Sequence, residues 1–576
     1  SVDLTTRLPS GLLARVWPSD RILLGIRISK RLREELTQHA PTVSLIQKNP
    51  LVHGVRFSRI TALDYYKTLQ QFPLSKIELS LMGGVEESNV VVEVLEMAAA
   101  TDGMSKNIVQ LDVYNHGLAD LRTVMLSHFL SKFENLRHLS LDTNLISCPG
   151  AVALSEVLGK LSRLKNLSLC NNSIGSQGGE ALGAMLGKCK SLCALSLEVP
   201  TESVIRIAQG ISHCTTLKEL TVLSDDHFES LSSTAAEALS RSLSNCTNLE
   251  ALVLDMAMEE DGPVLEIAEG LKHCLNLQAL DLSGAGMSQE ALVSLGEKLN
   301  GCTRLDRLDL SRNQRLDVSA ARRFGAWLGG LKRLKTLELD QLLGSEEAAL
   351  VARSCMKGGC TRVEELVLNS RPGRWDPGDP THVVEVAAWA GVCPRLRALS
   401  FNHHPIQTEA FLNQIRSCGT LRELSLQACS LTQASRFALA RMLAALTHLT
   451  HLNLSHNLIL GPGMAVVIGA LGYCSGLVRV DLRRTGMEDE GATAMGQVLR
   501  KLPALRLLVL KGCGIGSSGG DMIARVLPGC SRLEELRIRW NVMGPNMEQK
   551  LLRAAGSQIS VDLEEGALGE PEFTSE

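Results

Sequence analysis

Aromatic side chains are scarce in this chain of 576 residues: they make up 3% of it, whereas hydrophobic residues together make up 45%. Any core must therefore be built mainly from leucine, alanine and valine. The net charge is only −3, which excludes a molecule that binds nucleic acid through its overall charge. No run of 18 apolar residues occurs, so no membrane-spanning helix is predicted.

Common motifs of catalysis are also lacking. The sequence contains neither a P-loop nor an H-E-x-x-H pattern. No nucleophile, base and acid can be assembled from its residues into a catalytic set. The sequence therefore points to recognition and not to turnover.

Cysteine, by contrast, is frequent, with 16 residues. Ten of these cysteines stand three residues before the first apolar residue of a recurring L-x-x-L-x-L pattern. They are Cys189, Cys214, Cys246, Cys274, Cys302, Cys360, Cys393, Cys418, Cys474 and Cys530. A fixed offset kept over this distance indicates one structural unit repeated many times. At such positions we predict small buried hydrophobes with free thiols, which suits a reducing compartment.

The repeat period is mostly 28 or 29 residues. The leading apolar positions are Leu74, Ile108, Leu136, Leu164, Leu192, Leu217, Leu249, Leu277, Leu305, Leu334, Val363, Leu396, Leu421, Leu449, Leu477, Leu505 and Leu533. A period of 20–29 residues with this strand motif is the signature of leucine-rich repeats. The sequence thus predicts about 17 units.

One unit, residues 164–189, illustrates the expected structure. Leu164, Leu167 and Leu169 are predicted to point inward from a strand, and the amide of Asn172 to satisfy backbone groups in the turn. Residues 180–189 then carry apolar side chains at helical spacing. Strands stack about 4.8 Å apart and helices roughly 8–10 Å apart. The stack must therefore curve, with strands on its concave side and helices on its convex side.

The long unit, the helix in every repeat and the cysteine before the strand resemble the ribonuclease-inhibitor class of leucine-rich repeat proteins. The resemblance covers residues 74–563 and implies an α/β fold, a curved solenoid or horseshoe. That class includes inhibitors, GTPase-activating proteins and the sensor halves of immune receptors. In several units the turn residue is not asparagine, as at His404, Cys429, Thr485 and Cys513. We expect looser turns there.

The two ends of the chain differ from the repeats. Residues 1–73 are predicted to form a helical cap over the first repeat, as a solenoid needs. Within them, residues 7–36 resemble an F-box through a Leu-Pro opening at Leu8 and an Ile-Ser-Lys-Arg ending at Ile28, although several residues of that pattern are missing. Residues 564–576 are acidic and poor in apolar residues, which predicts a disordered tail.

Two apparent sites are explained by the repeat. The segment GIGSSGG at 514–520 matches both G-x-S-x-G and G-x-G-x-x-G. The same place in an earlier unit has Gln177 where Ser518 stands, so the glycines belong to the turn between strand and helix. His403 and His456 share one repeat position, but no cysteine or carboxylate completes a zinc site with them. We predict no cofactor and no metal.

Residues between the strand leucines should face the concave solvent. There the middle of the chain is acidic, with Glu198, Glu250, Asp255, Asp281, Asp306, Asp309, Glu338, Asp340, Glu364 and Glu365. The C-terminal end is basic, with Arg479, Arg483, Arg484, Arg506, Lys511, Arg537 and Arg539, beside Trp540. Arginine and tryptophan are enriched at binding hot spots, so this basic end is the predicted partner-binding patch. The alternative is that these charges only solvate a wide surface.

A second candidate lies in a loop that lengthens the unit starting at Val363. Prolines and glycines in the segment NSRPGRWDPGDP prevent a helix or strand, and loops on a rigid frame often make specific contacts. Arg374, Trp375 and Asp376 are the candidate residues. A neutral insertion is the alternative.

These features predict a non-enzymatic protein-interaction scaffold or a subunit of a larger assembly, with a protein partner and no small-molecule substrate. Two alternatives stay open: an F-box substrate receptor of a ubiquitin ligase, and a GTPase-activating protein of the leucine-rich repeat type. The expected location is intracellular, in the cytoplasm or nucleus. An organelle reached after removal of a transit peptide also stays open.

Overall fold

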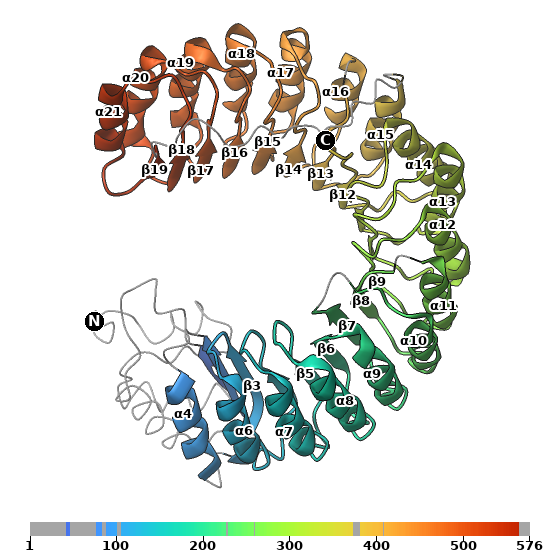
Figure 1. Cartoon of the computed structure of the whole chain (residues 1–576). Helices are drawn as coiled ribbons and strands as arrows, with labels where there is room; N and C mark the ends of the chain where they lie inside the picture. The colour runs from blue at the N-terminus through green and yellow to red at the C-terminus, as the bar shows by residue number, and fades with distance from the viewer. Residues whose placement is uncertain are drawn as a thin grey trace. The chain divides into compact units, whose positions relative to one another are not determined.

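The computed structural model describes residues 42–46, 76–82, 88–100, 105–225, 229–258, 260–372, 379, 381–406 and 408–563. The chain divides into two compact units, residues 1–277 and 278–576. In each unit, strands lie side by side along one concave face, and helices cover the opposite, convex face (Figure 1). The predicted α/β curved repeat fold is confirmed.

The first unit contains eight described strands, each paired in parallel with the next. They are β1 (Thr42–Ile46), β2 (Lys76–Met82), β3 (Ile108–Tyr114), β4 (His138–Ser140), β5 (Asn166–Ser168), β6 (Ala194–Val199), β7 (Glu219–Ser224) and β8 (Ala251–Asp255). The helices are α4 (Ser88–Ala100), α6 (Ala119–Leu130), α7 (Cys148–Leu158), α8 (Gly175–Leu186), α9 (Val204–Ile211), α10 (Ser233–Asn245) and α11 (Asp261–Leu271).

The second unit repeats this arrangement through eleven described strands. They are β9 (Ala279–Asp281), β10 (Arg307–Asp309), β11 (Thr336–Glu338), β12 (Glu365–Val367), β13 (Ala398–Ser400), β14 (Glu423–Ser425), β15 (His451–Asn453), β16 (Arg479–Asp481), β17 (Leu507–Val509), β18 (Glu535–Arg537) and β19 (Ser560–Asp562). The helices are α12 (Gln289–Lys298), α13 (Val318–Gly330), α14 (Ser345–Gly358), α15 (Thr381–Gly391), α16 (Glu409–Ile415), α17 (Arg436–Ala445), α18 (Gly461–Leu471), α19 (Glu488–Val498), α20 (Ser517–Val526) and α21 (Pro545–Ala555).

The ends of the chain bear on the predicted boundaries. Strand β1 lies inside residues 1–73 and pairs in parallel with β2, so the sheet begins before residue 74. The F-box-like segment 7–36, the rest of the expected helical cap and the tail 564–576 lie outside the described residues. No helix among the described residues is long and apolar enough to cross a membrane.

The strand leucines form the core in register. In the second unit the central residues of successive strands face one another directly, as in Leu280, Leu308 and Leu337. All three are fully buried. Since side chains alternate along a strand, the residues on either side of each leucine face the concave solvent. This alternation places the candidate site residues.

Helix α8 begins earlier than predicted. The apolar stripe indicated a helix over 180–189, but α8 runs from Gly175 to Leu186 and includes the glycines that precede the stripe. A Cβ atom on Gly183 would stand 2.5 Å from the carbonyl of Arg206 in the next unit. Glycine therefore lets α8 and α9 approach closely, and the helix continues through a segment that glycine would otherwise disfavour.

A ladder of buried side chains joins successive turns. Asn457 is fully buried. Its Nδ2 donates to the carbonyls of Leu426 (2.7 Å) and Leu454 (2.9 Å), and its Oδ1 accepts from the N–H groups of Cys429 (2.9 Å) and Leu431 (3.1 Å). Asn457 thus bonds its own strand end and both the strand end and the turn of the preceding repeat.

Several non-asparagine turn residues keep the bond to the preceding repeat, in contrast to the looser turns expected. The thiol of Cys429 donates to the carbonyl of Phe401 (3.1 Å), and that of Cys513 to the carbonyl of Leu482 (3.0 Å). The ring nitrogen Nε2 of His404 lies 2.7 Å from the carbonyl of Leu368. The inter-repeat bond therefore requires a buried donor at this position and not asparagine in particular.

The cysteines are free thiols packed between repeats. Of all sixteen, twelve are buried and four (Cys148, Cys170, Cys193 and Cys530) are partly exposed. Nine of the ten motif cysteines are among the buried ones, which confirms their predicted packing role. Burial raises the pKa of Cys246 to about 11 and, with smaller effects of neighbouring thiols, that of Cys214 to about 12.

A thiol count should reflect this burial. Under native conditions at pH 8 we expect a thiol reagent to label four cysteines or fewer within minutes, because the others are buried and shielded from the reagent. In denaturant without reductant, we expect nearly all sixteen to react. Finding most cysteines in disulfides would contradict the packing described here.

Candidate partner-binding surface

The apparent catalytic motif at 514–520 is a helix cap. Asp489, from the preceding repeat, accepts hydrogen bonds at Oδ1 from the N–H groups of Gly516 (2.7 Å) and Gly519 (2.9 Å). Its Oδ2 accepts from the hydroxyl of Ser518. The first turn of α20 is thereby satisfied by a side chain. Asp120 caps α7 in the first unit in the same way, through Ser147 and Gly150.

The stability that the Asp489 cap gives to α20 should depend on pH in a defined way. Burial alone would raise the pKa of Asp489, but the hydrogen bonds from Ser518, Gly519 and Gly516 hold it below its ordinary value. The cap therefore stabilises the fold above a pH of about 4, the ordinary pKa of an aspartate, and is lost as the pH falls through the lowered pKa. Replacing Asp489 by Asn should destabilise α20 by about 1 kcal/mol at pH 7, because neutral hydrogen bonds are weaker than those accepted by a carboxylate. Hydrogen exchange of the α20 amides measures this loss.

The matched control for this prediction is Asp120→Asn, which should loosen α7 and leave α20 unchanged. The difference between wild type and Asp489→Asn should shrink towards pH 3. Equal exchange of α20 in both proteins at pH 7 would show that Asp489 is not a cap.

The structure separates the predicted basic residues into two groups. Arg479 begins β16 and Arg506 precedes β17, so both lie toward the amino ends of the strands. Arg537 ends β18, and Arg483, Arg484, Lys511, Arg539 and Trp540 follow the carboxyl ends of β16–β18. Arg483, Lys511 and Arg539 occupy one repeat position on three neighbouring strands, about 4.8 Å apart. We call these three residues the cationic row.

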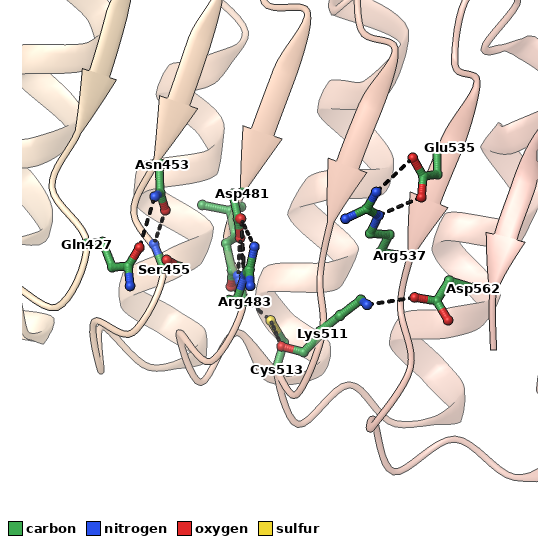
Figure 2. A network of polar contacts seen from close by, with 11 residues as sticks. Gln427, Asn453, Ser455, Asp481, Arg483, Lys511, Cys513, Glu535, Arg537 and Asp562 are labelled. Atoms are coloured by element: carbon green, nitrogen blue, oxygen red, sulfur yellow. Dashed lines mark hydrogen bonds and ion pairs between the residues drawn. The ribbon is translucent and has the colours of Figure 1, made fainter. Parts of the chain in front are cut away.

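Carboxylates pair with several of these cations and reduce the net positive charge of this surface (Figure 2). Arg483 Nη2 lies 2.6 Å from Oδ2 of Asp481, whose side chain is only 5% exposed. Lys511 Nζ lies 2.7 Å from Asp562 Oδ2, and Arg537 Nε lies 2.5 Å from Glu535 Oε1. Arg506 pairs with Glu534 at 3.1 Å. The seven predicted cations thus stand with four carboxylates, which leaves a net charge of three positive.

The pairing has a consequence for mutagenesis. From the sequence alone, reversing Arg483 to Glu is expected to leave the fold intact. The structure shows that this change would leave the buried carboxylate of Asp481 beside a second negative charge, which is costly. Arg484, which is exposed, is the safer position for testing charge in binding.

Trp540 lies between two members of the cationic row. The guanidinium carbon of Arg539 stands 4.1 Å from the centre of a ring of Trp540, and Lys511 Nζ stands 5.7 Å away. Such stacking orients both the ring and the cations. The residue is 37% exposed, and Val542 nearby is 73% exposed. Apolar surface therefore lies next to positive charge.

Trp540 also adopts a left-handed backbone conformation, with φ at +61°. The same repeat position is left-handed in other units of the second half, which carry Gly284, Arg312, Gln341, His403, Ala428, His456, Arg484 and Gly512 there. The turn imposes this conformation whatever the residue. For a bulky residue it costs roughly 1 kcal/mol relative to glycine.

The histidines of this position are not assembled into a metal site. No group of three histidine, cysteine or carboxylate side chains in the described part of the chain could hold a metal ion. Burial, together with the charges of Arg484 and Arg483, lowers the pKa of His456. Burial likewise lowers the pKa of His403. Both rings are therefore uncharged at neutral pH.

The remaining candidates are distributed as follows. Among the acidic residues, Glu198, Glu250 and Asp255 belong to the first unit and the others to the second. The loop residues Arg374, Trp375 and Asp376 lie outside the described residues. Their predicted contact role stays a prediction.

Comparison with known proteins agrees with the repeat geometry. The family described as Leucine Rich repeat matches residues 445–466, which span the end of one unit, the strand β15 and the start of α18. The chain is built of leucine-rich repeats. The ribonuclease-inhibitor subclass and the F-box resemblance gain no support beyond the sequence.

Two curated relatives match part of this leucine-rich repeat chain. Tonsoku-like protein of Mus musculus is 27% identical over 170 residues, which is 28% of this chain and 12% of that protein. Tonsoku-like protein of Danio rerio is 30% identical over 161 residues, 26% of this chain and 11% of that protein. The match thus spans about a tenth of the length of these relatives. Among solved structures, the yeast Rad7 and Elc1 complex contains a chain of TM-score 0.43 and 14% identity, which covers 88% of this chain and 98% of its own length.

Proposed function

We propose that this leucine-rich repeat protein is a non-enzymatic interaction scaffold, or a subunit of a larger assembly, that binds a protein partner on the concave face and turn edge of its C-terminal repeats. The observation that carries the proposal is Trp540, which is partly exposed between Arg539 and Lys511. An exposed indole in a strained turn brings no benefit to a surface that contacts only water. On a binding surface the same indole supplies apolar contact area.

The proposed partner contacts are Arg479, Arg483, Arg484, Arg506, Lys511, Arg537, Arg539 and Trp540, with the loop residues Arg374, Trp375 and Asp376 as a second contact. We further propose a reducing intracellular compartment, because sixteen free cysteines, twelve of them buried, suit one.

The test is recovery of a stoichiometric partner from native extract at low salt with the tagged full chain. We expect the double variant Arg484→Glu/Trp540→Ala to lose that partner. Arg416→Glu, an exposed residue that follows α16 on the helical side, should retain it and is the matched control. Recovery of the chain alone, or a partner footprint wholly on the helices, would contradict the proposal.

A further inference from the structure

We propose that the concave face of the second unit binds an extended polypeptide segment of opposite charge at its two ends. Its basic end would lie over β9–β11 and its acidic end over β16–β18. This inference rests on the proposed function, because it takes the concave face as the binding surface, and it names the class of partner.

The first element is a row of carboxylates, which we call the anionic row. Asp281, Asp309 and Glu338 lie directly opposite one another on the neighbouring strands β9, β10 and β11. Like charges in such cross-strand positions destabilise a sheet. Burial raises the pKa of Glu338, the charge of Asp309 reinforces this, and Arg307, 3.0 Å away, opposes it. A cationic segment laid across these strands would relieve the repulsion.

The second element is the stretch between the two rows, which carries uncharged side chains at the two repeat positions that form the rows; Glu365 and Glu423 lie at the amino ends of β12 and β14. The hydroxyl of Ser400 donates to Oδ1 of Asn369 (2.8 Å), and the hydroxyl of Ser425 donates to Oδ1 of Asn402 (2.8 Å). The side chain of Asn453 donates to that of Gln427 (3.3 Å). Amides and hydroxyls thus continue across β12–β15, where they can hydrogen-bond the backbone of a segment without selecting its sequence.

The third element is the cationic row, with a donor beside it. Ser455 follows β15, next to Arg483 on the neighbouring repeat, and it is 1% exposed. Within the described part of the chain, its hydroxyl has no hydrogen-bond partner. A buried unsatisfied hydroxyl is costly, and an acidic side chain held by Arg483 would accept its hydrogen bond. Trp540 closes this end with apolar surface.

The spacing sets the length of the segment. From β9 to β18 the strands take nine steps of about 4.8 Å, or about 40 Å. An extended chain advances about 3.3 Å per residue. The segment therefore contains about a dozen residues. The five steps from β11 to β16 span about 24 Å, so about six uncharged residues separate its charged ends.

The charge order favours a polypeptide over a nucleic acid. A phosphate backbone is negative along its whole length, so it would meet the cationic row favourably and the anionic row unfavourably. A polypeptide can carry both signs. We therefore treat oligonucleotide binding as an outcome that would overturn the proposal.

The experiment uses the full chain and labelled 12-residue synthetic peptides measured by fluorescence anisotropy. A block peptide of three lysines, six serines and three glutamates should bind about tenfold more tightly than a peptide of the same composition in alternating order. Glu338→Gln and Arg539→Gln should each weaken the block peptide about threefold. Glu346→Gln, an exposed residue on α14, should leave it unchanged.

A photo-crosslinker on the peptide ends tests the orientation. The lysine end should label β9–β11 and the glutamate end β16–β18. Equal binding of block and alternating peptides to the wild-type chain overturns the proposal and needs no variant to fold. Tighter binding of a single-stranded 12-mer oligonucleotide than of the block peptide overturns it too. If the recovered partner depends on Trp540 while the block order has no effect, this inference fails and the proposed function stands.

Discussion

Replacing Asn457 by Ala should lower the free energy of unfolding of the second unit by about 3 kcal/mol. The change removes the buried hydrogen bonds that Nδ2 donates to three carbonyls, and it leaves two buried N–H groups, those of Cys429 and Leu431, without an acceptor. Each buried group left unsatisfied costs about 1–3 kcal/mol. Urea unfolding of the full chain gives the loss, and hydrogen exchange locates it around β14 and β15.

Asn457→Cys is the matched control, because Cys429 and Cys513 occupy the same repeat position and keep the bond to the preceding repeat. The thiol fits and donates, but it is a weaker acceptor than an amide oxygen. We expect about half the loss of the alanine variant. If alanine and wild type unfold at the same urea concentration, the turn ladder does not stabilise the stack.

Replacing Trp540 by Ala should weaken binding of the recovered partner by about 2 kcal/mol, or about 30-fold. The indole supplies apolar contact area beside the cations of Arg539 and Lys511, and an alanine side chain is too small to supply it. Competition between labelled wild-type and variant chains for the partner measures the change.

Trp540→Gly separates binding from folding at this position. It should lose the same affinity as the alanine variant and be more stable than that variant by about 1 kcal/mol, because glycine adopts a positive φ without strain. Arg484→Glu should mainly slow association and reduce its dependence on salt. Wild-type affinity in both tryptophan variants would remove Trp540 from the contact.

The repeat explains why so much of the fold was predictable. Leucine spacing alone determines which side chains point inward, and the recurring cysteine fixes where the return loop meets the next strand. Helix starts were harder, because Gly175 and Gly178 are poor helix residues in isolation, and the close approach of α8 to its neighbours becomes visible only in the assembled stack.

The candidate surface was predictable in part. Strand alternation predicts that Arg483, Lys511 and Arg539 lie on the concave side. The same rule could have predicted the Asp481–Arg483 pair, since residues two apart share a face. Asp562 could not, because it comes from β19, which lacks the full leucine motif. The sequence also does not show that asparagine, cysteine and histidine replace one another as donors within the turns, because the carbonyls that accept their hydrogen bonds lie in the preceding repeat.

The left-handed residue at the edge of most turns of the second unit bears on how such a protein changes partner. The backbone there keeps one shape whether the residue is Gly512, Ala428, His456 or Trp540. A substitution at this position therefore changes the side chain at the edge of the turn without moving the neighbouring strands. Successive units offer a line of independently variable positions on an invariant frame, so recognition can diverge between related chains one residue at a time while their folding is conserved.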